Sequence, residues 1–472
     1  MYQINFNHPI WVHFIGIGGI SMSGLASVLL KAGFRVSGSD SAASALTRQL
    51  EENGARIMLG QRAGNIEPGM DLVVYTAAIH PDNPEFEAAV SAGIPMMTRA
   101  QLLGEIMANY KLSVAVSGTH GKTTTTSMLS CMTMEAGLDP TISVGGILKA
   151  IGGNIRVGSS QVFITEACEY TNSFLSLRPY ISIILNIDAD HLDFFKDLDD
   201  IRHSFRTFAG LTASEGTLVI HAGIPDLEGF TQGLACRVIT FSEGPLVPSN
   251  DPADYPAGVI HHYHPEHIVF NELGFASFDA YRDDVCIGHF DLSVPGMHNV
   301  TNACAAIAAC DALGADMPAM RRGLTAFTGT DRRFELKGEK NGIRVIDDYA
   351  HHPTEIKATL KAAARYPGNE IWCVFQPHTY TRTQALLDEF AEALSHADHV
   401  ILADIYAARE INTIGISSED LAEKLRERGA DAIYLPSFEA IKNHLRAHAR
   451  SGDLIMTVGA GNIYQVGEDF LK

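Results

Sequence analysis

The sequence feature that most constrains the fold is a repeated pattern: an apolar, β-branched run, then glycines, then a helical run. It occurs as WVHFIGIGGISMSGLASVLLKAG (11–33) and again as KLSVAVSGTHGKTTTTSMLSCMTMEAG (111–137). A third series of apolar strands begins with IRVIDD (343–348), after the charged junction FTGTDRRFELKGEKNG (327–342). Alternating strands and helices predict mostly parallel sheets covered by helices, which defines an α/β protein. The restarts predict these domains: 1–109, 110–326 and 327–472.

Length and composition narrow the class of protein. With 472 residues, 46% hydrophobic and 19% charged, the chain is long enough for roughly three buried cores. A formal net charge of -20 disfavours nucleic acid as a partner, because its phosphates would be repelled. The N-terminal text lacks a secretory signal pattern, no apolar run is long enough to cross a bilayer, and the seven Cys lack paired spacing. We therefore expect a cytoplasmic protein with no membrane partner, either a monomer or a weak homodimer.

The first glycine turn has the residues of a diphosphate site. Gly16, Gly18 and Ser21 nearly match the pattern G-x-G-x-x-G, and Asp40 ends the following strand. Glycines allow the backbone to approach a pyrophosphate, and the start of the next helix favours negative charge. The pattern does not distinguish a dinucleotide from a UDP-sugar, because both carry a pyrophosphate and a ribose. A purely structural turn in an α/β domain is the remaining alternative.

The second glycine turn, AVSGTHGKTTTT (115–126), indicates a nucleotide-binding loop. The usual phosphate loop has glycine where this chain has Val116, so this loop is shorter and is framed by Gly118 and Gly121. Its amides could surround phosphate oxygens, Lys122 could reach the terminal phosphates, and a threonine hydroxyl could bind Mg²⁺. The alternative is a glycine turn with a surface lysine. Four consecutive threonines at a helix start disfavour that alternative, because β-branched residues are mediocre helix formers.

Acidic residues follow two later apolar strands, within TEACEY (165–170) and NIDADHLDFF (186–195). The carboxyl ends of parallel strands share one edge of a sheet, so these side chains should lie near the second glycine turn. Carboxylates and imidazoles could supply the further ligands of a phosphate-bound Mg²⁺. Any single one of them could equally be a solvated strand end. The candidates are Glu166, Glu169, Asp188, Asp190, His191 and Asp193.

The segment 241–291 is irregular, with Pro, Asp and His scattered through it. We expect a peripheral insertion of short antiparallel strands there, and its role is left open. Its histidines are expected to be solvent-exposed loop residues rather than a metal site, because neither Cys nor regular helical spacing accompanies them. They are His261, His262, His264 and His267.

A set of motifs covers nearly the whole chain: GTHGKTTTT, EACEYTNSFL, NIDADHLDFF, GMHNVTNACAA, DRRFELKGE, VIDDYAHHPTEI and FQPHTYTRT. In type and order they resemble the Mur ligases of peptidoglycan synthesis. HFIGIGGISMSGLA is also similar to the UDP-substrate domain of that family. The resemblance implies a Rossmann-like N-terminal UDP-substrate domain, a central P-loop ATPase-like domain with a mostly parallel sheet, and a C-terminal Rossmann-like domain for the amino acid and the nucleotide.

The resemblance implies an ATP-dependent acid–amino-acid ligase that uses Mg²⁺. Its substrates would be UDP-N-acetylmuramate and L-alanine. The γ-phosphate of ATP would pass to the lactyl carboxylate, and the alanine amine would attack the resulting acyl phosphate, with release of ADP and phosphate. A close alternative is a recycling ligase that attaches a murein peptide in place of alanine. An NAD-dependent dehydrogenase would leave the second glycine turn and the third domain without a task, and a nucleotide-binding regulator without transfer chemistry is the last alternative.

The resemblance also implies roles for individual residues. Those expected to be catalytic are Lys122, Glu166, His191 and Arg333. Those expected to bind ATP are Gly118, Thr119, His120, Gly121, Lys122, Thr123, Thr124, Asn299, Asn302, Arg333 and Asp348. Thr123 and Glu166 are expected to hold a first Mg²⁺, and His191 a second one near the acyl phosphate. Those expected to contact the other substrates are Gly18, Gly19, Asp40 and Thr76 on the UDP side, and His352, His378 and Arg382 on the amino-acid side.

Overall fold

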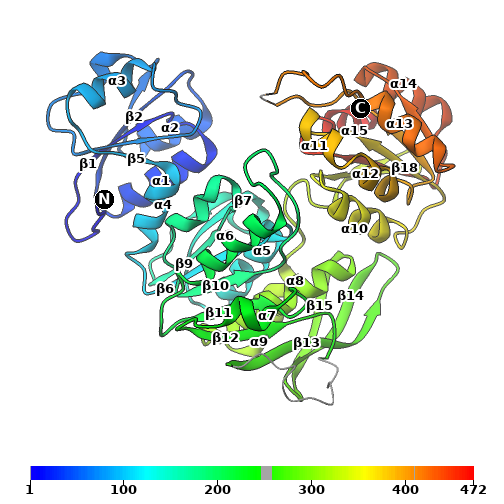
Figure 1. The fold of residues 1–472 in the computed structure, drawn as a ribbon, viewed down its shortest axis with the longest axis horizontal. Helices are drawn as coiled ribbons and strands as arrows, with labels where there is room; N and C mark the ends of the chain where they lie inside the picture. Colours follow the sequence, from blue (N-terminus) through cyan, green and yellow to red (C-terminus); the bar gives the residue numbers. More distant parts are fainter. Residues whose placement is uncertain (1, 246–257, 409) are drawn as a thin grey trace.

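The computed structural model describes residues 2–245, 258–408 and 410–472, and within them the chain forms three β-sheets. Each sheet and its helices form one lobe, and the N-terminal (blue) and C-terminal (yellow to red) lobes both adjoin the central lobe (Figure 1). The predicted α/β class with three sheet-bearing units is confirmed. No helix in these described ranges is long and apolar enough to cross a membrane.

The N-terminal lobe contains a parallel five-stranded sheet in the order β3-β2-β1-β4-β5. Its main elements are β1 (Trp11–Ile15), α1 (Ile20–Lys31), β2 (Arg35–Asp40), α2 (Ala45–Glu52), β3 (Arg56–Leu59), β4 (Leu72–Tyr75), α3 (Pro84–Ser91), β5 (Met96–Thr98) and α4 (Arg99–Met107). Ser44 and Thr98 begin α2 and α4 with capping boxes. The strand order reverses between β1 and β4, and such a switch point is where an open parallel sheet binds its ligand.

The central lobe contains a ten-stranded sheet in the order β15-β14-β13-β12-β11-β10-β6-β9-β7-β8. Its strands are β6 (Leu112–Ser117), β7 (Thr141–Leu148), β8 (Gly153–Arg156), β9 (Val162–Glu166), β10 (Ile181–Ile184), β11 (Thr217–His221), β12 (Arg237–Phe241), β13 (Val259–Phe270), β14 (Phe275–Arg282) and β15 (Val285–Pro295). Its helices are α5 (Lys122–Glu135), α6 (Leu198–Ala209), α7 (Leu227–Thr231), α8 (Met297–Ala312) and α9 (Met317–Ala326). Because β6 lies between β10 and β9, the loop that follows it opens at the middle of the sheet edge.

The prediction of a peripheral insertion with short strands is wrong for the described part of 241–291. β13, β14 and β15 have 12, 8 and 11 residues, and they continue the central sheet beyond β12. β14 and β15 are antiparallel as expected, whereas β13 is parallel to β12. The part of this prediction that concerns 246–257 lies outside the described residues.

The predicted exposure of the histidines is also wrong for two of them. His262 and His264 are each 5% exposed, because residues two apart in a strand lie on the same face and this face of β13 is covered. Their rings stack with centroids 5.3 Å apart. Thr240 and Ser242 lie within hydrogen-bond distance of the His262 ring nitrogens, at 2.9 and 3.0 Å, and burial lowers the pKa of His262 to about 4. His267 is exposed as expected. The alternation of side chains between the two faces of the strand, and not the polarity of the sequence, decides which of these rings are buried.

The C-terminal lobe contains a six-stranded sheet in the order β16-β17-β21-β18-β19-β20, parallel apart from β16. Its strands are β16 (Glu335–Lys340), β17 (Ile343–Asp348), β18 (Ile371–Phe375), β19 (His399–Leu402), β20 (Asp431–Tyr434) and β21 (Leu454–Val458). Its helices are α10 (Pro353–Ala363), α11 (Tyr380–Ala385), α12 (Leu387–Leu394), α13 (Ser418–Glu427), α14 (Phe438–His448) and α15 (Tyr464–Leu471). Separate apolar clusters cover the two faces of this sheet.

Candidate active site

Two glycines with positive φ shape the loop between β6 and α5. Gly118 and Gly121 have φ of +139° and +86°. A Cβ added at Gly121 would lie 2.7 Å from Oδ1 of Asn302, so only glycine fits without displacing that amide. The loop is fastened to the segment after β10, because Oδ1 of Asn186 accepts a hydrogen bond from the His120 amide at 2.8 Å. The start of α5 is therefore kept accessible to an anionic ligand.

Lys122, the first residue of α5, supplies the positive charge at the end of this loop. Its ammonium donates hydrogen bonds to the carbonyl oxygens of Gly118 (2.6 Å) and Thr119 (3.0 Å), and it lies 3.2 and 3.0 Å from the carboxylate oxygens of Glu169. Burial alone would lower the pKa of Lys122, but the negative charge of Glu169 outweighs burial and the pKa is raised. A fixed ammonium next to the start of a helix is suited to phosphate oxygens.

Glu169, predicted from the sequence only as one of several candidate Mg²⁺ ligands, connects two of the predicted catalytic residues. It is 2% exposed, and its Oε1 lies 3.7 Å from Nε2 of His191 in addition to its contact with Lys122. The ring of His191 in turn packs against that of Tyr170, with ring centroids 4.5 Å apart and the planes tilted by 32°. The signal that could have indicated this contact is the place of Glu169 in the turn that directly follows β9, three residues after Glu166.

Thr123 and Glu166 supply oxygen atoms next to Lys122. Oε1 of Glu166 accepts a hydrogen bond from the Gly145 amide at 2.5 Å. Burial raises the pKa of Glu166, against the opposing effects of the Gly145 amide, the Thr123 hydroxyl and the charge of Lys122. A buried carboxylate of this kind is stabilised in its ionised form by a nearby cation. Hydroxyl and carboxylate oxygens are the ligands that Mg²⁺ prefers, so this pair fits that ion.

A cavity of about 390 Å³ opens between this loop and the C-terminal lobe. The predicted ATP-binding residues that line it are His120, Gly121, Thr124, Asn299, Asn302, Arg333 and Asp348. Nδ2 of Asn302 donates to Oδ1 of Asn299 at 3.3 Å, and Nδ2 of Asn299 donates to the Pro295 carbonyl at 2.7 Å. Amide side chains fixed in this way can present both donors and acceptors to a heterocycle.

Asp348, at the end of β17, brings a carboxylate to the same cavity from the C-terminal lobe. Its oxygens accept hydrogen bonds from the amides of Phe334 (3.0 Å) and Ala350 (2.8 Å) and from the Thr359 hydroxyl (3.1 Å). Burial raises the pKa of Asp348 to about 6, and the positive charge of Arg333 partly opposes this rise. His120, Gly121 and Thr124 at the end of the loop and the start of α5 thus share one cavity with an arginine and a carboxylate of the C-terminal lobe.

The three residues predicted for the amino-acid side lie at the junction of the two lobes. Arg382 bonds Oδ1 of Asp190 through Nη2 (2.9 Å) and Nε (3.2 Å), and its Nη1 lies 3.3 Å from Nδ1 of His378. Burial would raise the pKa of Asp190, but the Arg382 charge prevails and holds it well below its usual range. His352 begins α10, and its Nε2 lies 3.1 Å from the carbonyl oxygen of Ala189. A carboxylate ligand of Arg382 would therefore have to compete with Asp190.

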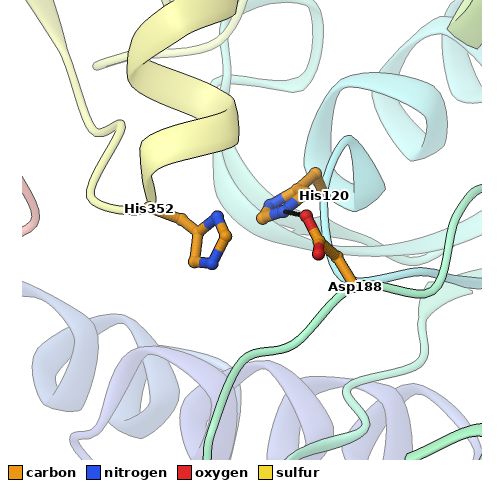
Figure 2. Close-up of side chains that lie close together, drawn as sticks. All are labelled: His120, Asp188 and His352. Carbon is orange, nitrogen blue, oxygen red and sulfur yellow. Dashed lines mark hydrogen bonds and ion pairs between the residues drawn. The ribbon is translucent and has the colours of Figure 1, made fainter. Parts of the chain in front are cut away.

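The His120 side chain links the loop to both the segment after β10 and the C-terminal lobe. Its Nε2 lies 3.3 Å from Oδ2 of Asp188, and its Nδ1 lies 3.1 Å from Oε1 of Glu355 in α10. Burial would lower the pKa of His120, but the hydrogen bonds to Asp188 and Glu355 outweigh it and raise the pKa to about 9. Asp188 was predicted from the sequence as a strand-end acid and candidate Mg²⁺ ligand, and Glu355 was missed, because its place beside the loop depends on the docking of two lobes. The ring also packs against His352, with centroids 4.8 Å apart (Figure 2).

The residues predicted for the UDP side meet at the first glycine turn. The Gly18 amide donates to Oδ2 of Asp40 at 2.8 Å, and a Cβ at Gly16 would contact Thr76 at 3.4 Å. Gly19 is exposed and directly precedes α1. These residues follow β1, β2 and β4, so they occupy the strand-order switch point of the N-terminal sheet.

A second, larger cavity of about 660 Å³ lies in the C-terminal lobe, where β18 to β21 begin. Trp372, His399, His444 and Arg450 are among its lining residues. It contains no residue predicted for ATP, Mg²⁺ or substrate, and it lies at the sheet edge opposite Asp348. The cavity beside the loop, although smaller, is therefore the one that matches the sequence-based hypothesis.

Family models match three consecutive parts of the chain. Residues 11–111 match the Mur ligase family catalytic domain, 116–310 the Mur ligase middle domain, and 332–461 the Mur ligase glutamate ligase domain. The chain belongs to the Mur ligase family, as its motifs predict.

Individual relatives are similar over their full length. A protein of Lachnospira eligens named UDP-N-acetylmuramate–L-alanine ligase is 56% identical over 472 residues, covering 100% of both chains. The crystal structure of a UDP-N-acetylmuramate–alanine ligase from Thermotoga maritima has a TM-score of 0.76 at 29% identity and covers 98% of each chain. The structure of a murein peptide ligase from Psychrobacter arcticus has a TM-score of 0.67 at 26% identity, again over 98% of each chain.

Proposed function

We propose that this chain is an ATP-dependent ligase that joins L-alanine to the lactyl carboxylate of UDP-N-acetylmuramate in peptidoglycan synthesis. The observation that carries the proposal is the cavity beside Lys122, where a phosphate-type loop faces Arg333 and Asp348 of another lobe. The full-length similarity to ligases with these substrates in their name supports the choice of acid and amine. The products would be the amide, ADP and phosphate.

Each lobe has a part in this reaction. In our proposal 1–109 binds UDP-N-acetylmuramate at the first glycine turn, 110–326 binds ATP on the loop that ends at Lys122, and 327–472 supplies residues for the amino acid and the nucleotide. The position of the loop at the middle of the largest sheet supports this division, because residues of the C-terminal lobe reach the edge at which it opens. Thr354 of the C-terminal lobe, for example, donates to Asp188 at 2.8 Å.

The chemistry follows from the poor reactivity of a carboxylate toward amines. Lys122 and Arg333 would stabilise the negative charge that develops as the γ-phosphoryl group moves to a carboxylate oxygen. Phosphate is then the leaving group when the alanine amine attacks the carbonyl carbon. Asn299, Asn302 and Asp348 would fix the adenosine end of ATP, and the loop amides would hold its phosphates in line with the acceptor.

Thr123, Glu166 and His191 would hold Mg²⁺, which when bound neutralises phosphate charge and polarises the transferred group. The fit is best for Thr123 and Glu166, whose ligand atoms are oxygens. His191 offers an imidazole whose Nε2 lies close to Glu169, at 3.7 Å. Glu169 would then contact both residues, since it stabilises the charged form of Lys122 and lies beside His191.

The decisive test is coupled phosphate release with ATP, Mg²⁺ and UDP-N-acetylmuramate against a panel of amino acids. We expect release that depends on L-alanine, with glycine and L-serine as measures of strictness. No release in the complete mixture would refute the proposal. A competition between L-alanine and a murein tripeptide separates it from the recycling ligase, and titration with NADH tests the dehydrogenase alternative.

The cytoplasmic location and the state of monomer or weak homodimer stay predictions. Size-exclusion chromatography with light scattering at several protein concentrations measures the oligomeric state. A mass that rises with concentration would indicate the weak dimer.

A further inference from the structure

A cluster of two histidines and an aspartate lies where the central and C-terminal lobes meet. His120 comes from the loop after β6, Asp188 from the segment after β10, and His352 from the start of α10 (Figure 2). One ligand atom of each residue lies within 4.8 Å of the other two. Among the residues that the structure describes, this is the one group of three His, Cys, Asp or Glu side chains with such spacing.

Two of the three possible ligand atoms, those of His120 and Asp188, already have the separation found in a metal site. Nε2 of His120 and Oδ2 of Asp188 are 3.3 Å apart. Two ligands of a tetrahedral ion with bonds of about 2.0–2.2 Å are separated by about 3.3–3.5 Å, so this pair needs little movement. His352 needs more, because its Nε2 now lies 3.1 Å from the Ala189 carbonyl oxygen. Binding an ion would exchange that contact for a coordinate bond.

Both ligands of this pair are oriented by neighbours from α10. Glu355 lies 3.1 Å from Nδ1 of His120, which leaves Nε2 of that ring directed toward Asp188. The Thr354 hydroxyl donates to Oδ2 of Asp188 at 2.8 Å. A carboxylate on the far nitrogen of a histidine ligand is the usual support of a zinc-binding imidazole.

We propose that His120, Asp188 and His352 form an inhibitory Zn²⁺ site that ties the C-terminal lobe to the nucleotide loop. Two imidazoles and one carboxylate suit Zn²⁺, whereas Mg²⁺ and Ca²⁺ prefer oxygen ligands. The site is thus chemically distinct from the Thr123 and Glu166 pair. Water would take the fourth position.

The position of the cluster explains why binding would inhibit. His120 and Asp188 line the cavity proposed for ATP, together with Thr354 and Glu355. An ion held by residues of both lobes would fix the beginning of α10 against the loop. Nucleotide exchange, which requires access to that cavity, would then slow. High Mg²⁺ would not relieve this inhibition, because it does not compete well for nitrogen ligands.

The test is direct metal binding to the whole protein after removal of metals by chelation. Co²⁺ is the spectroscopic probe, since a tetrahedral nitrogen and oxygen site gives visible absorption, and Zn²⁺ displacement of Co²⁺ gives the affinity. The variants are Asp188→Asn and His352→Gln in the cluster, and Glu355→Gln beside it. The matched control is His378→Gln, which removes a neighbouring imidazole outside the cluster. His191→Gln removes the imidazole of the proposed Mg²⁺ set.

We expect the parent protein and both controls to give the tetrahedral spectrum and to gain thermal stability from one equivalent of Zn²⁺. Glu355→Gln should weaken Zn²⁺ binding by about 10- to 100-fold, and loss of a direct ligand by at least that factor. Unchanged affinity and spectrum in Asp188→Asn and His352→Gln would overturn the proposal, as would loss of the spectrum in His191→Gln alone. Unfolding temperatures measured with chelator separate these results from misfolding, and Glu355→Gln, which keeps every ligand, decides the matter if a ligand variant does not fold.

Discussion

The first and second glycine turns share one local design but provide different environments. Each follows a buried parallel strand and precedes a helix, and each has a glycine with positive φ. In the first turn the Gly18 amide is bonded to Asp40 of the same lobe. In the second, Lys122 is buried with Glu169, and residues of the C-terminal lobe line the cavity beside it.

The difference shows what a glycine turn does and does not specify. Both turns offer backbone amides and a helix start to an anion. Only the second adds a lysine, oxygen ligands for a cation and a wall from another lobe, which are the requirements of phosphoryl transfer. The first turn is thus suited to binding a diphosphate, and the second to phosphoryl transfer.

The largest expected effect is that of Lys122→Met on catalysis. Removal of the loop cation should lower kcat by about 10³- to 10⁵-fold, as for other charges that stabilise a transferring phosphoryl group. Because the change leaves Glu169 buried without its partner, it should also destabilise the fold. The double variant Lys122→Met with Glu169→Gln should recover stability but not activity, measured by phosphate release and thermal unfolding. Substantial activity in either variant would remove the distinction between the two turns.

A smaller effect is expected for Gly121→Ala, compared with Gly137→Ala at the other end of α5. Both glycines have positive φ, +86° and +69°, so both changes should cost about 1–2 kcal/mol of backbone strain. Only at Gly121 would the new Cβ meet a neighbour, 2.7 Å from Asn302, whereas nothing lies within 4 Å of Gly137. ADP affinity, measured by calorimetry, should fall about tenfold or more in Gly121→Ala alone. Equal losses in both variants would mean that strain, and not the shape of the loop, controls binding.

In the first turn, Gly18→Ala and Gly19→Ala form a similar pair. A Cβ at Gly18 would lie 2.8 Å from Oδ2 of Asp40 and would break its hydrogen bond, whereas at Gly19 the nearest atom is 3.5 Å away. Because the new Cβ would displace Asp40 from the proposed binding turn, KM for UDP-N-acetylmuramate should rise about tenfold or more in Gly18→Ala, with kcat preserved. Gly19→Ala should change KM little. A fall in kcat with unchanged KM would contradict the binding role of this turn.

The smallest effect is a pH dependence that should be confined to the second site. The pKa of Asp348 is raised to about 6 in the folded protein. The folded state therefore retains the Asp348 proton between about pH 4 and 6 where the unfolded state has lost it, and this residue's contribution to stability falls as pH rises through that window. A protonated Asp348 is a poorer acceptor of hydrogen bonds from the ribose hydroxyls than the carboxylate is. ADP binding should therefore weaken as pH falls below about 6. Asp348→Asn should abolish this pH dependence, whereas UDP binding at the first turn should keep its own pH profile in the variant.

Much of the fold could be predicted because its signals are local. Apolar runs such as 112–117 and 181–184 identified strands, and the glycine turns located the helix starts. The long strands of 259–295 could not be predicted in this way, because their polar text is typical of loops and their order is fixed by pairing with β12. The burial of His262 and His264 likewise depends on which face of that strand is covered.

The candidate site was predictable in its residue types and less so in its contacts. Lys122 and Thr123 were predicted from the loop pattern and Glu166 from its strand end and the family resemblance, and the three do lie together. The bond between Arg382 and Asp190, and those between His120, Asp188 and Glu355, join segments far apart in the chain.

The sequence by itself determined the strand–turn–helix units, the family and the glycines that admit a phosphate, because these depend on neighbours within a few residues. The tertiary structure alone decided that Glu169 would lie between Lys122 and His191, and that α10 would bring Glu355 to His120. Those contacts depend on how the turn after β9 folds back and how one lobe meets another, and no local pattern of residues encodes either.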